Sequence, residues 1–409
     1  MKHIKSCLKL FYKEQGIQYI KTKIDIKDYI YTDKYIVKFK NNTISHLYIK
    51  PLYRNMGLCG EIIKELTIKS DTYFVDIPKN SNNYIYLEKK FESYGFINGR
   101  LDRKYTYFVN RTDNFDKSTL FKLMKDFVRI ETVPTYADLM ILEVPYENYM
   151  KIDCKLRNHI SNVNQVDDKG NLYLNLPHLM PTSYVIKADT KISDIKIKKY
   201  PVIVKGTEGW CNSGASNQVC LTEEELFDFL FEKMGSEFMI QEYIINIDTS
   251  FKGLKYHLRM YWVVKFYDSP EPWRLMRRYR ITTARNKYNK DDLTDKNNQD
   301  THFGSTAAEY TDLDLPLEKA ESFYKQTIKM CADMYELIKH IRDEVDAYYV
   351  FGLDLLPTES GKLYLIECNS YPSILSKEND KKATILSDYY YNEIYNFIIK
   401  PYFAKINNF

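Results

Sequence analysis

The chain of 409 residues lacks several features that would place it in a special class of protein. No run of about 18 or more apolar residues occurs, so no transmembrane helix is expected. The first residues, MKHIKSCLKLFYKEQG, contain neither a long apolar segment nor a small-residue cleavage site, so no signal peptide is expected. The seven cysteines form no CxxC pair, which favours a reducing compartment such as the cytoplasm over a disulfide framework or a structural zinc site.

An excess of charge of one sign is also missing. The chain has 59 Lys and Arg against 55 Asp and Glu, a formal net charge of +4. Such a small excess indicates local basic sites for phosphate, and no general nucleic-acid surface is expected. The length predicts two to three domains, and the 44% hydrophobic content allows each domain to bury a core.

The most informative stretch is FGLDLLPTESGKLYLIECNSYPS, residues 351–373. Two apolar runs, Tyr349–Leu356 and Lys362–Cys368, are separated by a proline and a Ser-Gly turn, which predicts a β-hairpin. Asp354 lies on the first strand. Glu367 and Asn369 lie two residues apart at the end of the second strand, so their side chains share a face.

These three oxygen-bearing side chains are expected to converge. Mg²⁺ prefers hard oxygen ligands and takes the remaining ones from water and phosphate. A solvated sheet face could also carry an Asp and a Glu, but both acids are embedded in apolar runs, and unpaired carboxylates are rarely buried. The pattern G-x-D…L-x-E-x-N-x-x-P resembles the metal-binding end of ATP-grasp enzymes, which implies Mg²⁺ and ATP as cofactors with Asp354, Glu367 and Asn369 as metal ligands.

A second part of this resemblance lies in the apolar run 200–206 and the small-residue loop that follows it. A lysine at the end of a buried strand can point its charge into a cleft, although a hairpin with a flexible loop would have the same pattern. In ATP-grasp enzymes such a lysine contacts the α-phosphate and the loop folds over the triphosphate. The resemblance therefore implies nucleotide contacts from Lys205, Gly206, Ser213 and Gly214.

The run after the predicted helix that Thr222 and Glu225 cap, MIQEYI, resembles the hinge whose backbone reads adenine. The resemblance implies that Glu242, Tyr243 and Ile244 form this hinge, and Asp248 is expected to contact the ribose hydroxyls.

The segment KYHLRMYW, starting at Lys255, alternates as a half-buried strand does, so His257 and Arg259 face one way. It resembles the K-x-D-x-R-x-Y pattern of the tubulin–tyrosine-ligase-like branch, with His257 in place of Asp. An inward arginine near a triphosphate can clamp a transferring phosphoryl group. Downstream, WRLMRRYRITTAR is either a solvated strand pair or an anion pocket formed by Arg277, Arg278, Arg280 and Arg285. Lys205, Arg259 and Arg280 are the candidate catalytic residues.

Other segments carry weaker predictions. Lys169, ahead of a short strand at 172–174, is expected to be a surface lysine rather than a ligand. Residues 286–310 are expected to be a flexible substrate loop or partly disordered. His302 faintly matches a family histidine. The periodicity predicts one long core helix over 317–345 and a closing helix over 387–399 that Pro401 ends.

Near the N-terminus, residues 44–66 predict a strand, a tight turn with the pattern Arg-x-x-Gly-x-Cys-Gly, and a helix. With strands at 71–78 and 105–109 and a helix at 82–94, this order resembles the GNAT acetyltransferase family. The resemblance implies acetyl-CoA contacts from Leu47, Ile49, Arg54, Gly57, Cys59 and Gly60. Two departures, Cys59 and Phe91, leave open whether Tyr94 or Tyr86 supplies the acid, whether none is needed, or whether the domain only binds.

The sequence therefore predicts an α/β (α+β) fold: a GNAT-like mixed sheet with helices over 1–113, a connector or pre-grasp region over 114–190, and an ATP-grasp domain over 191–409. The resemblances imply an ATP-dependent carboxylate–amine ligase fused to an N-acetyltransferase, with a small-molecule or peptide substrate that bears a carboxylate and an amine. Two alternatives stay open: an acetyltransferase whose ATP-grasp domain only binds nucleotide, and a non-enzymatic scaffold.

Overall fold

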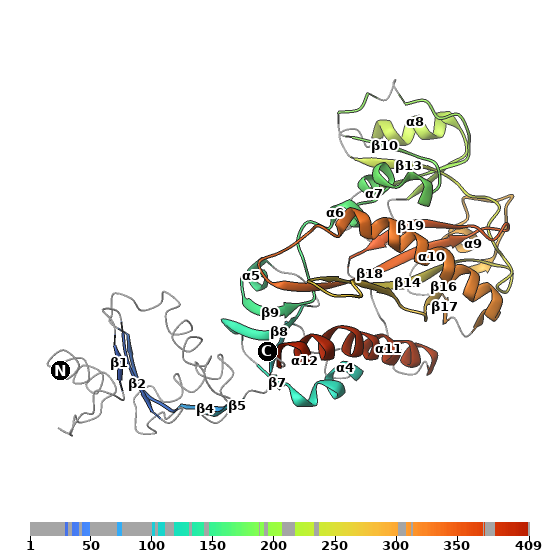
Figure 1. The fold of residues 1–409 in the computed structure, drawn as a ribbon. Helices are drawn as coiled ribbons and strands as arrows, with labels where there is room; N and C mark the ends of the chain where they lie inside the picture. Colours follow the sequence, from blue (N-terminus) through green and yellow to red (C-terminus); the bar gives the residue numbers. More distant parts are fainter. Residues whose placement is uncertain are drawn as a thin grey trace. The chain divides into compact units, whose positions relative to one another are not determined.

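The computed structural model describes residues 29–31, 35–40, 43–49, 72–75, 100–102, 105–110, 118–130, 133–142, 147–187, 189–191, 195–206, 217–232, 237–301, 308–311, 314–370, 372 and 381–407 (Figure 1). It has mixed helix and strand content with parallel and antiparallel pairing, which confirms the α+β class. The chain divides into two compact units, one of residues 1–117 and 121–157, the other of residues 118–120 and 158–409.

The first unit contains a five-stranded sheet in the order β1-β2-β3-β4-β5, with β1 Tyr29–Tyr31, β2 Tyr35–Lys40, β3 Thr43–Ile49, β4 Thr72–Val75 and β5 Arg100–Asp102. Its pairs are antiparallel except β3 with β4, which run parallel.

Four further strands of this unit pair in parallel: β6 Thr106–Val109, β7 Val128–Arg129, β8 Tyr136–Ile141 and β9 Asp153–Arg157. The strand predicted at 105–109 is confirmed as β6, but it belongs to a different sheet from β1–β5, because it pairs with β7 and β8. Helix α4 spans Thr119–Leu123 and is followed by a 3₁₀ turn, Met124–Asp126. A short helix, α5, spans Glu147–Met150.

The second unit begins with short helices, α6 Asn164–Asp167, α7 Lys169–Asn175 and a 3₁₀ turn Pro177–Leu179. A four-stranded antiparallel sheet follows in the order β10-β13-β11-β12, with β10 Ser183–Ile186, β11 Val202–Gly206, β12 Gln218–Cys220 and β13 Phe238–Glu242. Helix α8, Glu223–Glu232, packs Leu226 and Leu230 on one face of this sheet. The predicted cap is confirmed, since the Glu225 N–H donates to Thr222 Oγ1.

The other sheet of this unit is antiparallel, in the order β17-β16-β14-β18-β19, and β15 pairs with the far end of β14. The strands are β14 Leu254–Phe266, β15 Trp273–Leu275, β16 Arg280–Lys287, β17 Ala308–Thr311, β18 Asp346–Pro357 and β19 Leu363–Asn369. Alternation on β14 and β18 puts a row of large hydrophobic side chains of both strands on one face of this sheet. Helix α10, Leu317–Ile338, packs its buried stripe against that face (Figure 1).

The C-terminal helices lie on the opposite side of the sheet, where Tyr390 contacts Tyr261 of β14. They are α11 Lys381–Ile394, a π-helical turn Tyr395–Ile399 and α12 Lys400–Asn407. The prediction that Pro401 ends this helix is wrong. Pro401 is the second residue of α12, where a missing N–H is tolerated, and the π-helical turn precedes it.

Three other expectations are corrected. Residues 172–174 belong to helix α7, not to a strand, and the helix predicted over 317–345 ends at Ile338. The segment 286–301, expected to be flexible, continues β16 to Lys287 and forms helix α9, Lys296–Gln299. The buried Gln299 side chain donates to the carbonyls of Asn289 and Asp292, which ties this segment together.

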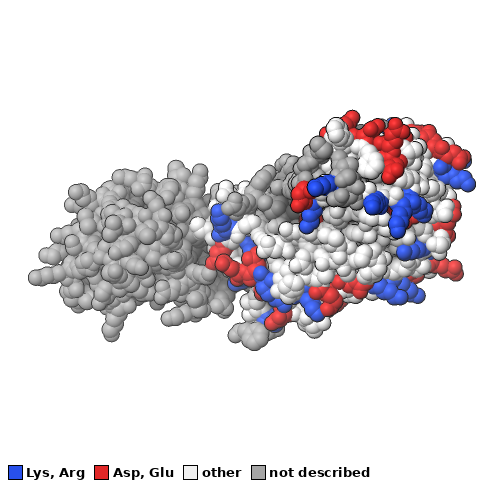
Figure 2. All heavy atoms as spheres, turned by 90° about the horizontal axis from the view of Figure 1, so that it is seen from above, with Lys and Arg blue, Asp and Glu red and all other residues white. Residues whose placement is uncertain are grey.

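The surface of the second unit mixes charges. Lysines and arginines alternate with aspartates and glutamates on the face drawn in Figure 2, and acidic side chains gather at one end of it. No helix in the described part of the chain has the length and hydropathy to span a membrane.

Candidate functional site

The predicted hairpin is confirmed as β18 and β19, which turn at Gly361, where φ is +80°. Its register places Asp354 directly opposite Glu367. On the other side of β18, Arg259 of β14 lies opposite Asp354, and Arg280 of β16 lies opposite Arg259. Residues directly opposite one another share a face. Two cations and two anions therefore form a single row across four strands.

A β-bulge in β19 decides which way Glu367 points. The pairing moves from Leu355 with Leu365 to Asp354 with Glu367, so β19 has one extra residue there. Leu365 and Cys368 are both in the core under α10. Without the extra residue, the alternation that buries Leu365 would also bury Glu367 in the core. The bulge instead turns Glu367 to the face that carries Asp354.

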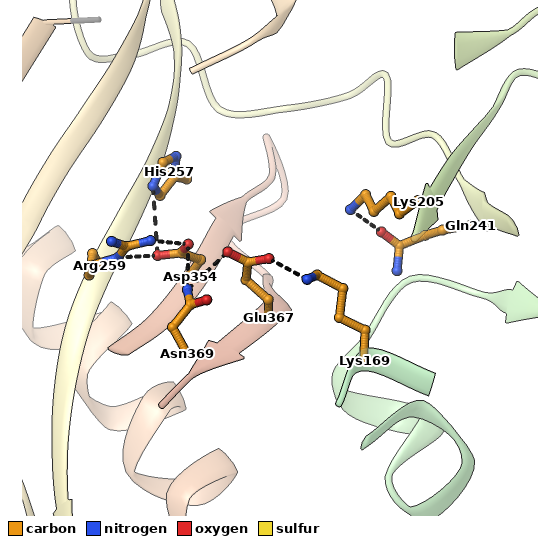
Figure 3. A network of polar contacts seen from close by, with 8 residues as sticks. All are labelled: Lys169, Lys205, Gln241, His257, Arg259, Asp354, Glu367 and Asn369. Atoms are coloured by element: carbon orange, nitrogen blue, oxygen red, sulfur yellow. Dashed lines mark hydrogen bonds and ion pairs between the residues drawn. The ribbon is translucent and has the colours of Figure 1, made fainter. Parts of the chain in front are cut away.

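The acidic end of the row is tightly bonded (Figure 3). Arg259 donates from Nε and Nη2 to the two oxygens of Asp354 at 2.7 and 2.6 Å, and Asp354 is buried. Asn369 Nδ2 donates to Asp354 Oδ2 at 3.2 Å and to Glu367 Oε1 at 2.9 Å. Burial alone would lower the pKa of Arg259, but the neighbouring Asp354 carboxylate raises it. The three predicted metal ligands therefore meet at one point.

The glycine and the proline of the sequence pattern also meet here. A Cβ on Gly352 would lie 2.6 Å from Pro372 Cβ and 3.6 Å from Arg259 Cδ. Only glycine lets the chain after Asn369 fold back over β18. The G-x-D and N-x-x-P halves of the pattern are thus one steric unit beside the Arg259–Asp354 pair.

The expectation that Lys169 is a surface lysine is wrong. Its side chain is 13% exposed, and Nζ lies 2.9 Å from Glu367 Oε2. The cause is the helix that replaces the expected strand: α7 begins at Lys169, and Asp168 caps it by accepting from the Asn171 N–H. Figure 3 shows Lys169 extending from this helix toward the hairpin.

Lys205 approaches the same carboxylates from β11 (Figure 3). It is 7% exposed, and its Nζ donates at 2.8 Å to Oε1 of Gln241, a neutral group. Gln241 Nε2 donates in turn to Ser183 Oγ at 3.1 Å. Burial lowers the pKa of Lys205 to about 8, an effect that Glu367 opposes and Lys169 reinforces. A buried ammonium with a neutral partner is a candidate site for an anion.

Lys255, which was not among the predicted site residues, is a second lysine of the site, half-buried and near the Asp300 carboxylate. Its Nζ donates at 2.8 Å to the hydroxyl of Tyr243, which donates to Gln299 Oε1 at 2.7 Å. Burial, and then the charge of Lys205, lower the pKa of Lys255 to about 7. Its place on the same face of β14 as Arg259, four residues away, was the available signal.

His257 lies on this face between Lys255 and Arg259, as the alternation predicts. It is buried, with Nδ1 2.7 Å from Thr301 Oγ1 and Nε2 3.7 Å from Asp354 Oδ1. The imidazole thus links the ordered segment 286–301 to the carboxylates.

The expected hinge is only partly available for a ligand. The N–H of Glu242 donates to the Thr182 carbonyl, and that of Tyr243 donates to the Pro201 carbonyl. Ile244 is therefore the hinge residue whose N–H, in the described part of the chain, makes no hydrogen bond within the protein.

Asp248, expected to contact the ribose, is held by the protein. It accepts from the Tyr256 hydroxyl at 2.9 Å and the Ser250 N–H at 2.8 Å, and it pairs with Lys319. Burial alone would raise the pKa of Asp248, but these hydrogen bonds lower it. These partners account for its burial without a ligand.

The four arginines of the basic run separate. Arg280 is buried in the charged row, whereas Arg277 extends outward to Glu321 at 2.8 Å with its side chain 65% exposed. Arg278 lies over the ring of Tyr389, and Arg285 is exposed.

Leu47 and Ile49 lie on β3, but Arg54, Gly57, Cys59 and Gly60 fall outside the described residues, as do Tyr86, Phe91 and Tyr94. Ser213, Gly214 and His302 fall outside them as well, while Gly206 ends β11.

Whether the hairpin fits a divalent cation can be tested on its donor set. The described residues contain no group of three or more His, Cys, Asp and Glu side chains placed to hold a metal. The hairpin offers two carboxylates and the Asn369 amide, which a turn about Cβ–Cγ converts from donor to oxygen ligand. Three oxygens suit Mg²⁺, which keeps water and phosphate in its other positions. The residues fit such an ion when an anion accompanies it.

No protein-family model matches the chain, and no curated protein sequence matches it either.

Proposed function

We propose that residues 158–409 bind a Mg²⁺–nucleoside triphosphate, most simply ATP, and catalyse carboxylate–amine ligation. The supporting observation is the Lys205 ammonium, which is buried opposite the Asp354–Glu367 hairpin with a neutral hydrogen-bond partner. A buried charge needs compensation, and a phosphate would supply it.

The charge of the whole cluster favours the same ligand. Five cationic side chains line it, Lys169, Lys205, Lys255, Arg259 and Arg280, against the three carboxylates of Asp354, Glu367 and Asp300. Such an excess suits a ligand with several negative charges. Bound Mg²⁺ would neutralise charge that develops on the transferring phosphoryl group.

The chain's residues would act by position and charge. Lys205 and Lys255 hold phosphate oxygens, and Arg259 and Arg280, adjacent in the row, hold the transferring group or the carboxylate that attacks it. A carboxylate that attacks the γ-phosphate gives an acyl phosphate and ADP. An amine then displaces inorganic phosphate and forms an amide. The attacking groups belong to the substrates, so the protein needs no nucleophile of its own.

For the N-terminal unit we propose acetyl-CoA binding and N-acetyl transfer, on the resemblance of residues 44–66 alone. An acetyltransferase whose second unit only binds nucleotide would release CoA but no ADP.

The test is ADP release from Mg²⁺–ATP with a panel of amino acids as carboxylates and amines, with products identified by mass. Glu367→Gln keeps the hairpin's shape and removes one negative charge from the metal site. Because metal-assisted stabilisation contributes several kcal/mol, ADP formation is expected to fall about a hundredfold or more. The melting temperature serves as the folding control. ADP release that persists in Glu367→Gln would contradict the proposal, as would a chain that releases no ADP with any pair.

A further inference from the structure

Lys169 occupies the Glu367 oxygen that faces away from Asn369. Its Nζ lies 2.9 Å from Oε2, while Oε1 accepts from Asn369 Nδ2 at 2.9 Å. We propose that Lys169 and a divalent cation compete for Glu367, so that Lys169 keeps the metal site closed until an anionic ligand draws its ammonium away. This inference rests on the proposed function.

The competition is electrostatic and takes place where water screens it poorly. The side chains of Lys169 and Glu367 are 13% and 22% exposed. An ammonium in contact with the carboxylate would lie within a few ångströms of a divalent ion on the same group, and like charges at that separation repel strongly in a partly buried site. Glu367 therefore accepts one cation or the other.

The backbone around Lys169 is fixed to the hairpin, so the exchange requires only the side chain to move. Leu172 of α7 lies in the same core as Cys368 of β19. Asp167, at the end of α6, hydrogen-bonds the side chain and backbone of Ser370, just past Asn369. Lys169 has a long flexible side chain, and its ammonium can leave Glu367 without displacing α7.

Lys205 marks where the released ammonium would go. The charge of Lys169 already lowers the pKa of Lys205, so the two ammonium groups lie within electrostatic range. An anion bound at Lys205 would attract Lys169 and uncover Glu367. Metal and anion binding would then be positively coupled, and by linkage each would strengthen the other by the same factor.

The decisive experiment measures Mn²⁺ alone, without nucleotide, by calorimetric titration of the full chain and of Lys169→Met. Loss of the competing ammonium should tighten Mn²⁺ binding about tenfold, the size expected for one partly buried charge-assisted contact. Lys169→Arg keeps the charge and should leave Mn²⁺ binding weak. Lys339→Met removes an equal charge from the exposed pair with Glu336 and should change Mn²⁺ affinity less than twofold, as a control for net charge.

A second titration, of ATP into the same variants, separates this inference from the proposed function. Lys169→Met should reduce the coupling between Mn²⁺ and ATP, because Glu367 is already uncovered. A folded Lys169→Met variant that binds Mn²⁺ no more tightly than the unaltered chain would overturn the inference, and so would absence of Mn²⁺ binding in both. If only ATP binding were absent, the proposed function would be overturned. The Mn²⁺ titration of Lys169→Met would still decide whether Lys169 competes with the metal for Glu367.

Discussion

The two faces of the β14–β18 sheet contrast sharply. On one face every inward residue of both strands is apolar, from Tyr256 to Phe266 on β14, and α10 seals it. On the other face the same strands carry Arg259, Asp354 and Lys255, which are held by hydrogen bonds. Further along this face, Tyr261 packs against Tyr390 of α11. The two faces differ because successive side chains along a strand point to opposite sides of the sheet.

The difference teaches what each face contributes. Apolar burial stabilises the fold by roughly 25 cal/mol per Å² without needing directional partners. Buried charges cost desolvation that their mutual attraction scarcely returns. The apolar face therefore accounts for stability, and the charged face requires another explanation, which the proposed binding of metal and nucleotide would supply. Substitutions on the two faces should therefore have different effects on stability and on ligand binding.

The largest effect is expected on the apolar face. Trp262→Ala empties a fully buried site under α10, and such truncations cost about 3–5 kcal/mol of unfolding free energy. Chemical denaturation monitored by circular dichroism measures it. A cost below about 1 kcal/mol would mean that this face does not hold the sheet together.

On the charged face the sign should reverse. Burial lowers the pKa of Lys205 from 10.5 to about 8, and each pKa unit corresponds to about 1.36 kcal/mol. Lys205→Met removes this buried ammonium, so stability at pH 7 should rise by about 3 kcal/mol. ATP affinity should fall at least about tenfold, because a phosphate loses its buried cation. Thermal unfolding and calorimetric titration measure the two effects. A variant that loses stability and retains ATP affinity would reverse the assignment of this face.

The pH dependence follows with a definite sign. The pKa of Lys205 is 10.5 in the unfolded chain, and burial lowers it to about 8 in the folded chain. Between these pH values the unfolded chain therefore binds more protons. The contribution of Lys205 to stability therefore rises as pH increases through this window, and Lys205→Met should remove that rise. ATP affinity should decrease over the same window, where the triphosphate is already fully ionised. An affinity that is flat from pH 7.5 to 9.5 would argue against Lys205 as a phosphate contact.

The sequence could predict the hairpin because its signals are local. Alternation and a turn glycine predict the hairpin, and the two-residue spacing puts Glu367 and Asn369 on one face. That this face is also the face of Asp354 and Arg259 depends on the β-bulge in β19, which alternation does not predict. The sequence could not predict the contact of Lys169 with Glu367, because the two residues are distant in sequence. The contact also depends on helix α7, whereas apolar residues at 172 and 174 have the spacing of a strand. The Gln241 partner of Lys205 likewise depends on the pairing of β11 with β13.

A smaller effect is expected at Gly352. A Cβ there would lie 2.6 Å from Pro372, so Gly352→Ala must push the chain after Asn369 away from β18. Overpacking of this kind costs about 1–3 kcal/mol. Mn²⁺ binding should weaken in parallel, because Asn369 moves with this segment. Gly361→Ala, at a turn with open space, is the matched control for glycine replacement; its strain from positive φ should lower stability and leave Mn²⁺ binding unchanged.

The smallest effect should distinguish two arginines that the sequence places three residues apart. Arg277 projects to Glu321 with its side chain 65% exposed, and exposed ion pairs contribute less than about 1 kcal/mol. Arg277→Ala should therefore change stability by under about 0.5 kcal/mol and ATP affinity less than twofold. Arg280→Ala, in the buried row beside Arg259, should reduce ADP formation at least about tenfold if it holds the transferring group. Equal losses from both variants would mean that the anion site extends to Arg277 at the surface, and that it is not limited to buried residues such as Arg280.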